Sequence, residues 1–246
     1  MANSTSGDSV LSRAVRLLSG FRDHEALTPS ELADHAGLPR TTGYRLIAEM
    51  SHLGLVTRSE GGFVEPGRLL WEIAQRSHLS RTLRQTALPF MQDVNAVVRH
   101  TTQLAVLDDA GVLIVEQLSR QGAAVNPAEV AGTMPVHLTS MGHVLLAFAD
   151  PDRTESWLST NRRLVETERP QLREELREAR ARGFARLSGE INAQTTGLSV
   201  PIVDRQGRSE AALTVVVPRD SPQIPQFLMA LQTAGHGISR AIGRGT

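Results

Sequence analysis

The sequence predicts an α+β protein with two parts: a small, mainly helical N-terminal domain and a larger domain that mixes helices with an antiparallel sheet. Two observations predict this class. Helical periodicities in residues 9–66 end in a pair of short strand patterns with a glycine-rich turn. From residue 81 onward, strand and helix patterns follow one another without strict β-α-β alternation, which favours an antiparallel sheet covered by helices. The length of 246 residues suits one or two domains.

Three helices are predicted in the first domain, over residues 9–21, 28–37 and 39–54. The first has apolar residues at helical spacing. The second has the start signals of a helix, because Thr28 suits the N-cap, Pro29 fits the first helical position and Glu31 completes a capping box. Gly37 and Gly54 each follow a helical pattern, as glycines at helix C-termini do.

The third helix sorts its side chains onto two faces. An apolar stripe, which we expect to pack on the first two helices, contains Leu46, Ile47, Met50 and Leu53. Another face contains Thr41, Tyr44, Arg45 and Ala48, with Arg40 and Thr42 at its N-terminal end. Strands at 55–57 and 63–64 flank a turn at 58–62. This pattern is that of a winged helix-turn-helix, whose plainest use is to place one exposed helix in a DNA groove.

Polar residues of that exposed face and of the hairpin are the candidate DNA contacts. They are Arg40, Thr41, Thr42, Tyr44, Arg45, Arg58 and Ser59. Arginine reaches phosphates or guanine edges, threonine suits phosphates or bases, and tyrosine contacts the backbone or a thymine methyl group. The helix turn at Pro39 leaves N–H groups available to a phosphate. Arg13, on the first helix, is either a phosphate contact or a partner for an acid such as Glu49.

The overall charge does not by itself predict a nucleic-acid partner. The chain has 26 basic and 26 acidic residues, and its first 70 residues carry seven arginines against eight acids. DNA binding therefore depends on where the charges are placed. All 26 basic residues are arginine, which reflects either a preference for bidentate contacts or codon bias in a GC-rich genome. A winged helix that contacts other proteins, attached to a ligand-binding or catalytic sheet domain, remains the alternative.

The remaining elements complete the predicted organisation. Residues 1–8 are expected to be a disordered tail, residues 67–80 a connecting helix and residues 81–246 the second domain. Helices are predicted there over residues 81–99, 140–149, 168–182 and 225–242. Strands are predicted over residues 102–107, 112–118, 183–187, 198–203 and 211–217, with a hairpin turn at 108–111.

What the sequence lacks narrows the possible chemistry and location. It has no cysteine, which removes disulfides, thiolate nucleophiles and cysteine-ligated zinc. No apolar run is long enough to span a membrane, and the N-terminus has no secretory signal, so we expect a cytoplasmic protein. Gly-x-Ser-x-Gly elbows, phosphate-binding loops and dinucleotide fingerprints are also missing, so the sequence does not support catalysis.

Several segments, taken in order, resemble the IclR-type transcriptional regulators of bacteria. They are Ser9-Val10 with Arg13-Ala14, ELADHAGLPRTTGYRL, LGLVTR, MPVHLTSMGHVLLAF, RGFARLSGE and SVPIVDRQGRSEAALTVVV. The resemblance covers residues 9–243. It implies a linker helix between the winged helix-turn-helix and a C-terminal effector-binding and oligomerisation domain with a curved, GAF-like antiparallel sheet.

The resemblance also implies a mechanism. Such regulators bind roughly palindromic double-stranded operator DNA, form dimers through the first domain and linker helix, and form tetramers through the second domain. A small organic or aromatic acid would favour one geometry of the homodimer or tetramer and so change the spacing of the recognition helices. We expect no cofactor.

By position, the resemblance implies an effector pocket in the second domain. Its lining would be Met134, Ser140, Met141, Leu187, Gly197, Thr214 and Val216. Residues 139–142 open a helix, whose free N–H groups suit a carboxylate. Alternatively, these residues are ordinary core and cap groups, with any ligand elsewhere.

This part of the chain also departs from the family pattern. Met141-Gly142-His143 stand where the family has a small residue followed by Gly-Lys. Leu187-Ser188-Gly189-Glu190 replace its Asp-x-Glu-Glu, and Gln194 replaces a following glycine. These changes concern the identity of the effector, because they lie outside the DNA-binding module.

Two histidines in the same region raise the question of a metal. His137 and His143 would need a third ligand, such as Glu190. We favour a hydrogen-bonded histidine near the pocket and a histidine at the surface, and we predict no metal site.

Overall fold

The computed structural model describes residues 8–22, 24–74, 79–120, 123 and 130–243, which form two compact units, Met1–Ser77 and His78–Thr246. All but the last residue of the predicted tail, residues 1–8, lie outside the described residues, and so do residues 75–78 of the predicted connecting helix. Residues 67–74 of the predicted helix belong to the first unit, where they include a helix over Arg68–Ala74, whereas residues 79–80 belong to the second unit.

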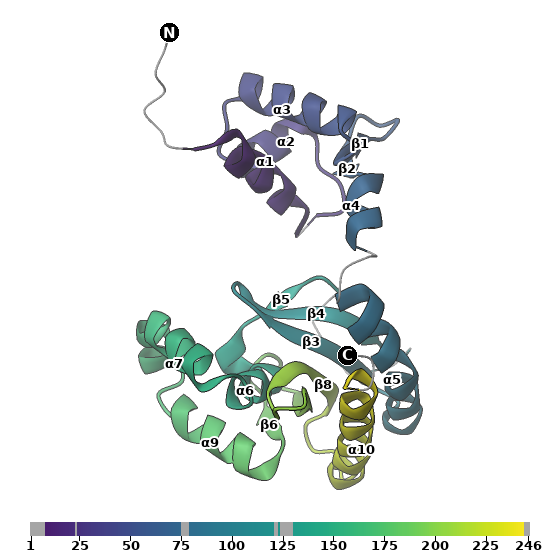
Figure 1. The fold of residues 1–246 in the computed structure, drawn as a ribbon, viewed down its shortest axis with the longest axis vertical. Helices are drawn as coiled ribbons and strands as arrows, with labels where there is room; N and C mark the ends of the chain where they lie inside the picture. The colour runs from purple at the N-terminus through teal and green to yellow at the C-terminus, as the bar shows by residue number, and fades with distance from the viewer. Residues whose placement is uncertain (1–7, 23, 75–78, 121–122, 124–129, 244–246) are drawn as a thin grey trace. The chain divides into compact units, whose positions relative to one another are not determined.

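The first unit is a winged helix-turn-helix, as predicted. Its elements are α1 (Val10–Ser19), α2 (Pro29–His35), α3 (Arg40–His52), β1 (Val56–Arg58), β2 (Val64–Pro66) and α4 (Arg68–Ala74) (Figure 1). The antiparallel strands β1 and β2 pair Thr57 with Glu65 and form the wing. A further antiparallel bridge joins Leu27 to Val64, so the loop before α2 is attached to the wing.

Local signals in the sequence account for the helix ends. The predicted capping box is confirmed: the Thr28 hydroxyl accepts a hydrogen bond from the N–H of Glu31 at 3.3 Å, and the N–H of Thr28 donates to Glu31 Oε2 at 2.8 Å. Gly37 and Gly54 have φ values of +62° and +74°, the left-handed conformation that ends a helix at little cost for glycine.

The core of the first unit holds α3 against α2 at close range. Leu17, Leu32 and Ile47 are each 0% exposed in this core. A Cβ placed on Gly43 would lie 2.5 Å from the Cβ of Ala33, so the two helices approach closely at this point. The prediction for Leu53 was wrong: it caps the end of α3 and is 56% exposed, because the apolar stripe stops one turn earlier, at Met50.

The second unit is an antiparallel sheet covered by helices on both faces. The strands lie in the order β5-β4-β3-β8-β7-β6. Their bounds are β3 (Thr101–Asp108), β4 (Gly111–Leu118), β5 (Thr133–Met134), β6 (Ala185–Ser188), β7 (Thr195–Val203) and β8 (Ser209–Pro218). The helices are α5 (Gln85–Val98), α6 (Ser140–Ala147), α7 (Pro151–Thr160), α8 (Arg162–Glu168), α9 (Leu172–Arg182) and α10 (Ile224–Ile242).

The predicted strands of this unit are all found, whereas some helices were missed. The short strand β5 and the helices α7 and α8 were not predicted, and the helix predicted from residue 168 begins only at Leu172. The start of α7 did have a signal in the sequence, because the Asp150 carboxylate caps the helix by accepting from the N–H of Asp152 and Pro151 occupies the first position.

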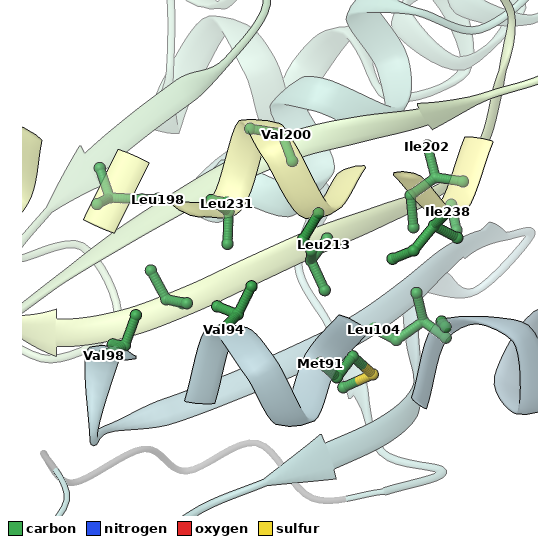
Figure 2. Packing of buried hydrophobic residues seen from close by; sticks show 14 of the residues in the cluster. Met91, Val94, Val98, Leu104, Leu198, Val200, Ile202, Leu213, Leu231 and Ile238 are labelled. Atoms are coloured by element: carbon green, nitrogen blue, oxygen red, sulfur yellow. The ribbon is translucent and has the colours of Figure 1, made fainter. Parts of the chain in front are cut away.

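Helices α5 and α10 pack on one face of the curved sheet, and α6 packs on the other with α9 against it. Figure 2 shows the first of these cores, in which Met91 of α5, Leu231 of α10 and Leu213 of β8 lie together. Residues alternate between the faces along each strand, so Leu104 belongs to this core and Ala105 to the core under α6. This alternation puts one side of β3, β7 and β8 opposite the start of α6.

Candidate functional site

A cavity of about 470 Å³, a volume that includes its open mouth, lies where the start of α6 meets the sheet. The structure brings all seven predicted pocket residues to its lining: Met134, Ser140, Met141, Leu187, Gly197, Thr214 and Val216. The remaining lining residues were not among the seven predicted for the pocket; they are Gln103, Leu138, Thr139, Gly189, Glu190, Ile191 and Thr195. That these residues bind an effector remains a prediction.

A row of buried polar side chains crosses the sheet beneath this cavity. The register places Gln117 of β4 beside Gln103 of β3, Gln103 beside Thr214 of β8, and Thr214 beside Ser199 of β7. Gln103, Thr214 and Ser199 are each 0% exposed. Polar groups buried in this way cost free energy unless they are hydrogen-bonded, so the partners of each one matter.

Most of this row is hydrogen-bonded. Gln103 Nε2 donates to Gln117 Oε1 at 2.8 Å. The hydroxyl oxygens of Ser199 and Thr214 are 2.7 Å apart, and those of Ser140 and Ser199 are 2.8 Å apart. The row therefore continues through three hydroxyl groups to the first residue of α6.

The start of α6 lies at the cavity and has backbone donors without partners inside the helix. Thr139 is the N-cap, and its hydroxyl accepts from the N–H of Gly142 at 3.2 Å. Ser140 and Met141 are the first residues of the helix, where N–H groups have no acceptor within the helix itself. The positive end of the helix dipole adds to the attraction for an anion at this point.

A tight backbone contact fixes the position of α6. A Cβ on Gly142 would lie 2.1 Å from the carbonyl oxygen of Val136 and 2.6 Å from its Cα. Position 142 therefore requires glycine because of the limited space. Its backbone conformation is helical and would suit any residue. The contact holds the helix start against the 3₁₀ turn at Val136–Leu138, at the edge of the cavity.

One acidic residue, Glu190, lies in the lining of the cavity. Its carboxylate is 2.6 Å from Nη1 of Arg169, and Nε of Arg169 also donates to Glu175 at 2.9 Å. The arginine offsets the negative charge that Glu190 would otherwise add to the cavity. Glu190 is the one acid of this segment that matches the Asp-x-Glu-Glu pattern of the family that the sequence resembles, and it has an arginine partner in this chain.

Neither histidine of this region is at the surface, which corrects the prediction for one of them. His137 is 4% exposed and donates from Nε2 to Glu168 at 2.8 Å. His143 is 1% exposed and donates from Nε2 to the carbonyl of His137 at 3.0 Å. Burial lowers the pKa of His143, against the opposing effect of that hydrogen bond. Among the residues that the structure describes, no group of side chains suits a metal ion.

The candidate DNA contacts lie on one helix and the wing. Arg40, Thr41, Tyr44 and Arg45 are exposed on α3, with Thr42 partly buried. Arg58 is the last residue of β1, one position later than predicted for this strand, and Ser59 follows it in the wing. Tyr44 is 42% exposed although it is a large aromatic residue. Pro39 is the N-cap of α3 and makes no side-chain cap bond, so the first N–H groups of the helix are open to a partner.

Two arginines near α3 already have partners within the unit. Nη2 of Arg40 lies 3.9 Å from Asp34 Oδ2, and both side chains are more than half exposed, so this ion pair is weak and can yield to a phosphate. Arg13 donates to the backbone carbonyl of Asp8 at 2.9 Å. The acid that we suggested for Arg13, Glu49, is not its partner.

Comparison with known proteins identifies the chain. The model of the IclR C-terminal domain of bacterial transcriptional regulators matches residues 75–240, and the model of the IclR helix-turn-helix domain matches residues 10–60. The chain belongs to the IclR family. It is therefore a DNA-binding transcriptional regulator with an N-terminal helix-turn-helix and a C-terminal effector domain, and the matched relatives are regulators as well.

Individual relatives span nearly the whole chain. The transcriptional regulator XynR of Escherichia coli is 26% identical over 244 residues, which is 94% of this chain and 96% of XynR. An IclR homolog from Microbacterium hydrocarbonoxydans, crystallised with 4-hydroxybenzoate, is 39% identical with a TM-score of 0.86, covering 97% of this chain and all of that one. A homolog from Microbacterium sp. strain HM58-2 is 37% identical with a TM-score of 0.59, covering 97% and 99%.

Proposed function

We propose that this IclR-family regulator binds a roughly palindromic operator through the exposed face of α3 and the wing, and that a small organic or aromatic acid in the cavity under α6 controls this binding. The observation that carries the effector half is the structure of the cavity. Ser140 and Met141, at the start of α6, contribute polar groups to the lining, and Met134, Met141 and Val216 contribute apolar side chains. The homolog that was crystallised with 4-hydroxybenzoate supports an acid of this size.

The acid would be held at its carboxylate by the start of α6. The N–H groups of Ser140 and Met141 and the positive end of the helix dipole favour a negative charge there. The Ser140 hydroxyl adds a donor. Because Arg169 pairs with Glu190, the nearby carboxylate does not repel the ligand strongly.

The DNA half of the proposal requires two copies of the chain. A palindromic operator presents two half-sites, so two copies of α3 are needed about one helical turn apart. Apolar side chains are exposed on α1 at Val10, Leu11 and Val15, and on α4 at Trp71 and Ile73. A second copy of the chain that covers them would form the homodimer, and the second unit would extend the assembly to a tetramer.

We propose that the ligand is bound without being turned over, as suits a member of a family of transcriptional regulators. No helix in the described part of the chain is long and apolar enough to cross a membrane. We place the protein in the cytoplasm, where its DNA is.

Fluorescence anisotropy with DNA from just upstream of the gene tests both halves. We expect tight binding that outcompetes random DNA and falls with salt, and a change in affinity when an aromatic acid is added. Arg45→Ala should weaken DNA binding about tenfold and reduce the salt slope by about 1, because one phosphate contact is lost. Arg163→Ala is the matched control, since it removes the same charge from an exposed position on α8.

The effector half is tested in the same assay. Met134 is only partly buried on β5, so Met134→Asp puts a negative charge into the lining at little risk to the core. We expect this variant to bind DNA normally and to lose its response to the acid, whereas Met134→Leu keeps both. An unchanged response in Met134→Asp would show that the acid binds elsewhere.

A further inference from the structure

One atom in the polar row has no hydrogen-bond partner. Gln103 Oε1 is buried, and it is the one side-chain nitrogen or oxygen atom that the described residues leave both buried and unpaired. The other end of the same amide is held, since Nε2 donates to Gln117. An unpaired buried carbonyl costs free energy comparable to a lost hydrogen bond, so a partner absent from the free protein is expected.

The location of Gln103 indicates where such a partner would lie. Gln103 lines the cavity, on the sheet side, and its neighbour across the strands is Thr214, which also lines it. Ser199 connects Thr214 to Ser140 at the start of α6. The lining thus holds two polar groups, the helix start and the Gln103–Thr214 pair, together with the apolar side chains of Met134, Met141 and Val216.

The chain of hydroxyl groups makes one of these polar groups a hydrogen-bond donor and the other a hydrogen-bond acceptor. Each hydroxyl group has one proton, so three hydroxyls linked by two hydrogen bonds have one proton left for an outside acceptor. An anion at the start of α6 accepts a hydrogen bond from the Ser140 hydroxyl, and Thr214 then donates to Ser199, which donates to Ser140. Thr214 is left as an acceptor, beside the acceptor Oε1 of Gln103. The sheet end of the occupied cavity therefore lacks donors among these groups and needs one from the ligand.

We propose that Gln103 recognises a hydroxyl or N–H group of the effector, at the end of the effector that is opposite the effector's carboxylate. The effector is then a hydroxylated or amino-substituted aromatic acid. This inference rests on the proposed function, because it places the carboxylate at α6. Gln103 Oε1 accepts the hydrogen bond that the free protein leaves unmade. Gln117 holds the amide in the orientation that this requires.

Isothermal titration calorimetry of the full chain tests this with four ligands: benzoate, 4-hydroxybenzoate, 4-methylbenzoate and 4-methoxybenzoate. The methyl compound matches the hydroxyl group in size, and the methoxy compound has an oxygen acceptor without a proton. We expect 4-hydroxybenzoate to bind the wild-type protein at least about tenfold more tightly than the methyl and methoxy compounds. Gln103→Met keeps the length of the side chain and removes the carbonyl, so it should reduce this preference to about twofold or less.

Each outcome has a defined meaning. Equal affinity of the wild-type protein for the hydroxy and methoxy compounds overturns the role of Gln103, and it does so even if the variant fails to fold. A preference that survives in a folded Gln103→Met also overturns it. If none of the four acids binds, the aromatic acid of the proposed function fails and this inference falls with it, whereas binding without discrimination refutes the inference alone.

Discussion

Moving one methyl group between two helices of the DNA-binding unit provides a sharp test of how α3 is held. In the structure, a Cβ on Gly43 would lie 2.5 Å from the Cβ of Ala33 and 3.3 Å from its Cα. Both positions are buried, and the obstructing atoms are fixed to the backbone of α2. Gly43→Ala must therefore push the helices apart, whereas Ala33→Gly removes the obstruction.

The expected magnitudes follow from two opposing effects. Alanine is favoured over glycine inside a helix by about 1 kcal/mol, and overpacking a core costs about 1–3 kcal/mol. The contact is well inside normal distances, so we expect the clash to outweigh the propensity and Gly43→Ala to destabilise the unit by about 1–2 kcal/mol. Ala33→Gly should destabilise it by about 1 kcal/mol through propensity alone.

The double variant decides the argument. In Gly43→Ala with Ala33→Gly, the propensity effects cancel and the methyl group is accommodated, so stability should return to within about 0.5 kcal/mol of wild type. Urea denaturation followed by circular dichroism measures this, and calorimetry separates the two units. DNA affinity should fall in Gly43→Ala and recover in the double variant. If the two destabilisations simply add, the close packing of α2 and α3 does not limit position 43.

Two further predictions concern the second unit. Gly142→Ala should lower the affinity for an aromatic acid at least about tenfold and should also lower the melting temperature, because the new methyl group meets the carbonyl oxygen of Val136 and displaces the start of α6. Calorimetric titration measures the affinity, and thermal melting measures the stability. An unchanged affinity would contradict the proposed role of α6. Burial holds the pKa of His143 below its ordinary value of 6.5, so the unfolded chain binds more protons than the folded one as pH falls below 6.5. Stability should therefore be fully present above pH 6.5 and decline below it, and His143→Gln, which keeps a donor for the His137 carbonyl, should show a smaller decline in melting temperature between pH 7 and 5.

The sequence was sufficient wherever a local rule determines the structure. The capping box at Thr28 and Glu31, the glycine after α3 and the strand pattern of residues 102–107 each depend on neighbours a few positions away. The seven predicted pocket residues came from the resemblance, and all of them line one cavity.

The sequence was insufficient where burial depends on distant segments. Every residue of α6 is buried, so helical periodicity could not reveal that His143 is inside. Gln103 is a lone glutamine in an apolar strand, and only the register with β4 and β8 shows what surrounds it. The helices α7 and α8 were missed because they are short and mostly polar, with little apolar periodicity to detect.

The exposed apolar surface of α4 also makes the protein convenient to observe. The chain has two tryptophans, Trp71 in the first unit and Trp157 in the second. Trp71 is 64% exposed, whereas Trp157 packs against the core under α6. Each unit thus carries its own intrinsic fluorophore. With Trp157 replaced by phenylalanine, a blue shift in emission upon concentration would report the covering of α4 by a second copy, and the reciprocal replacement would report the melting of the effector domain by itself.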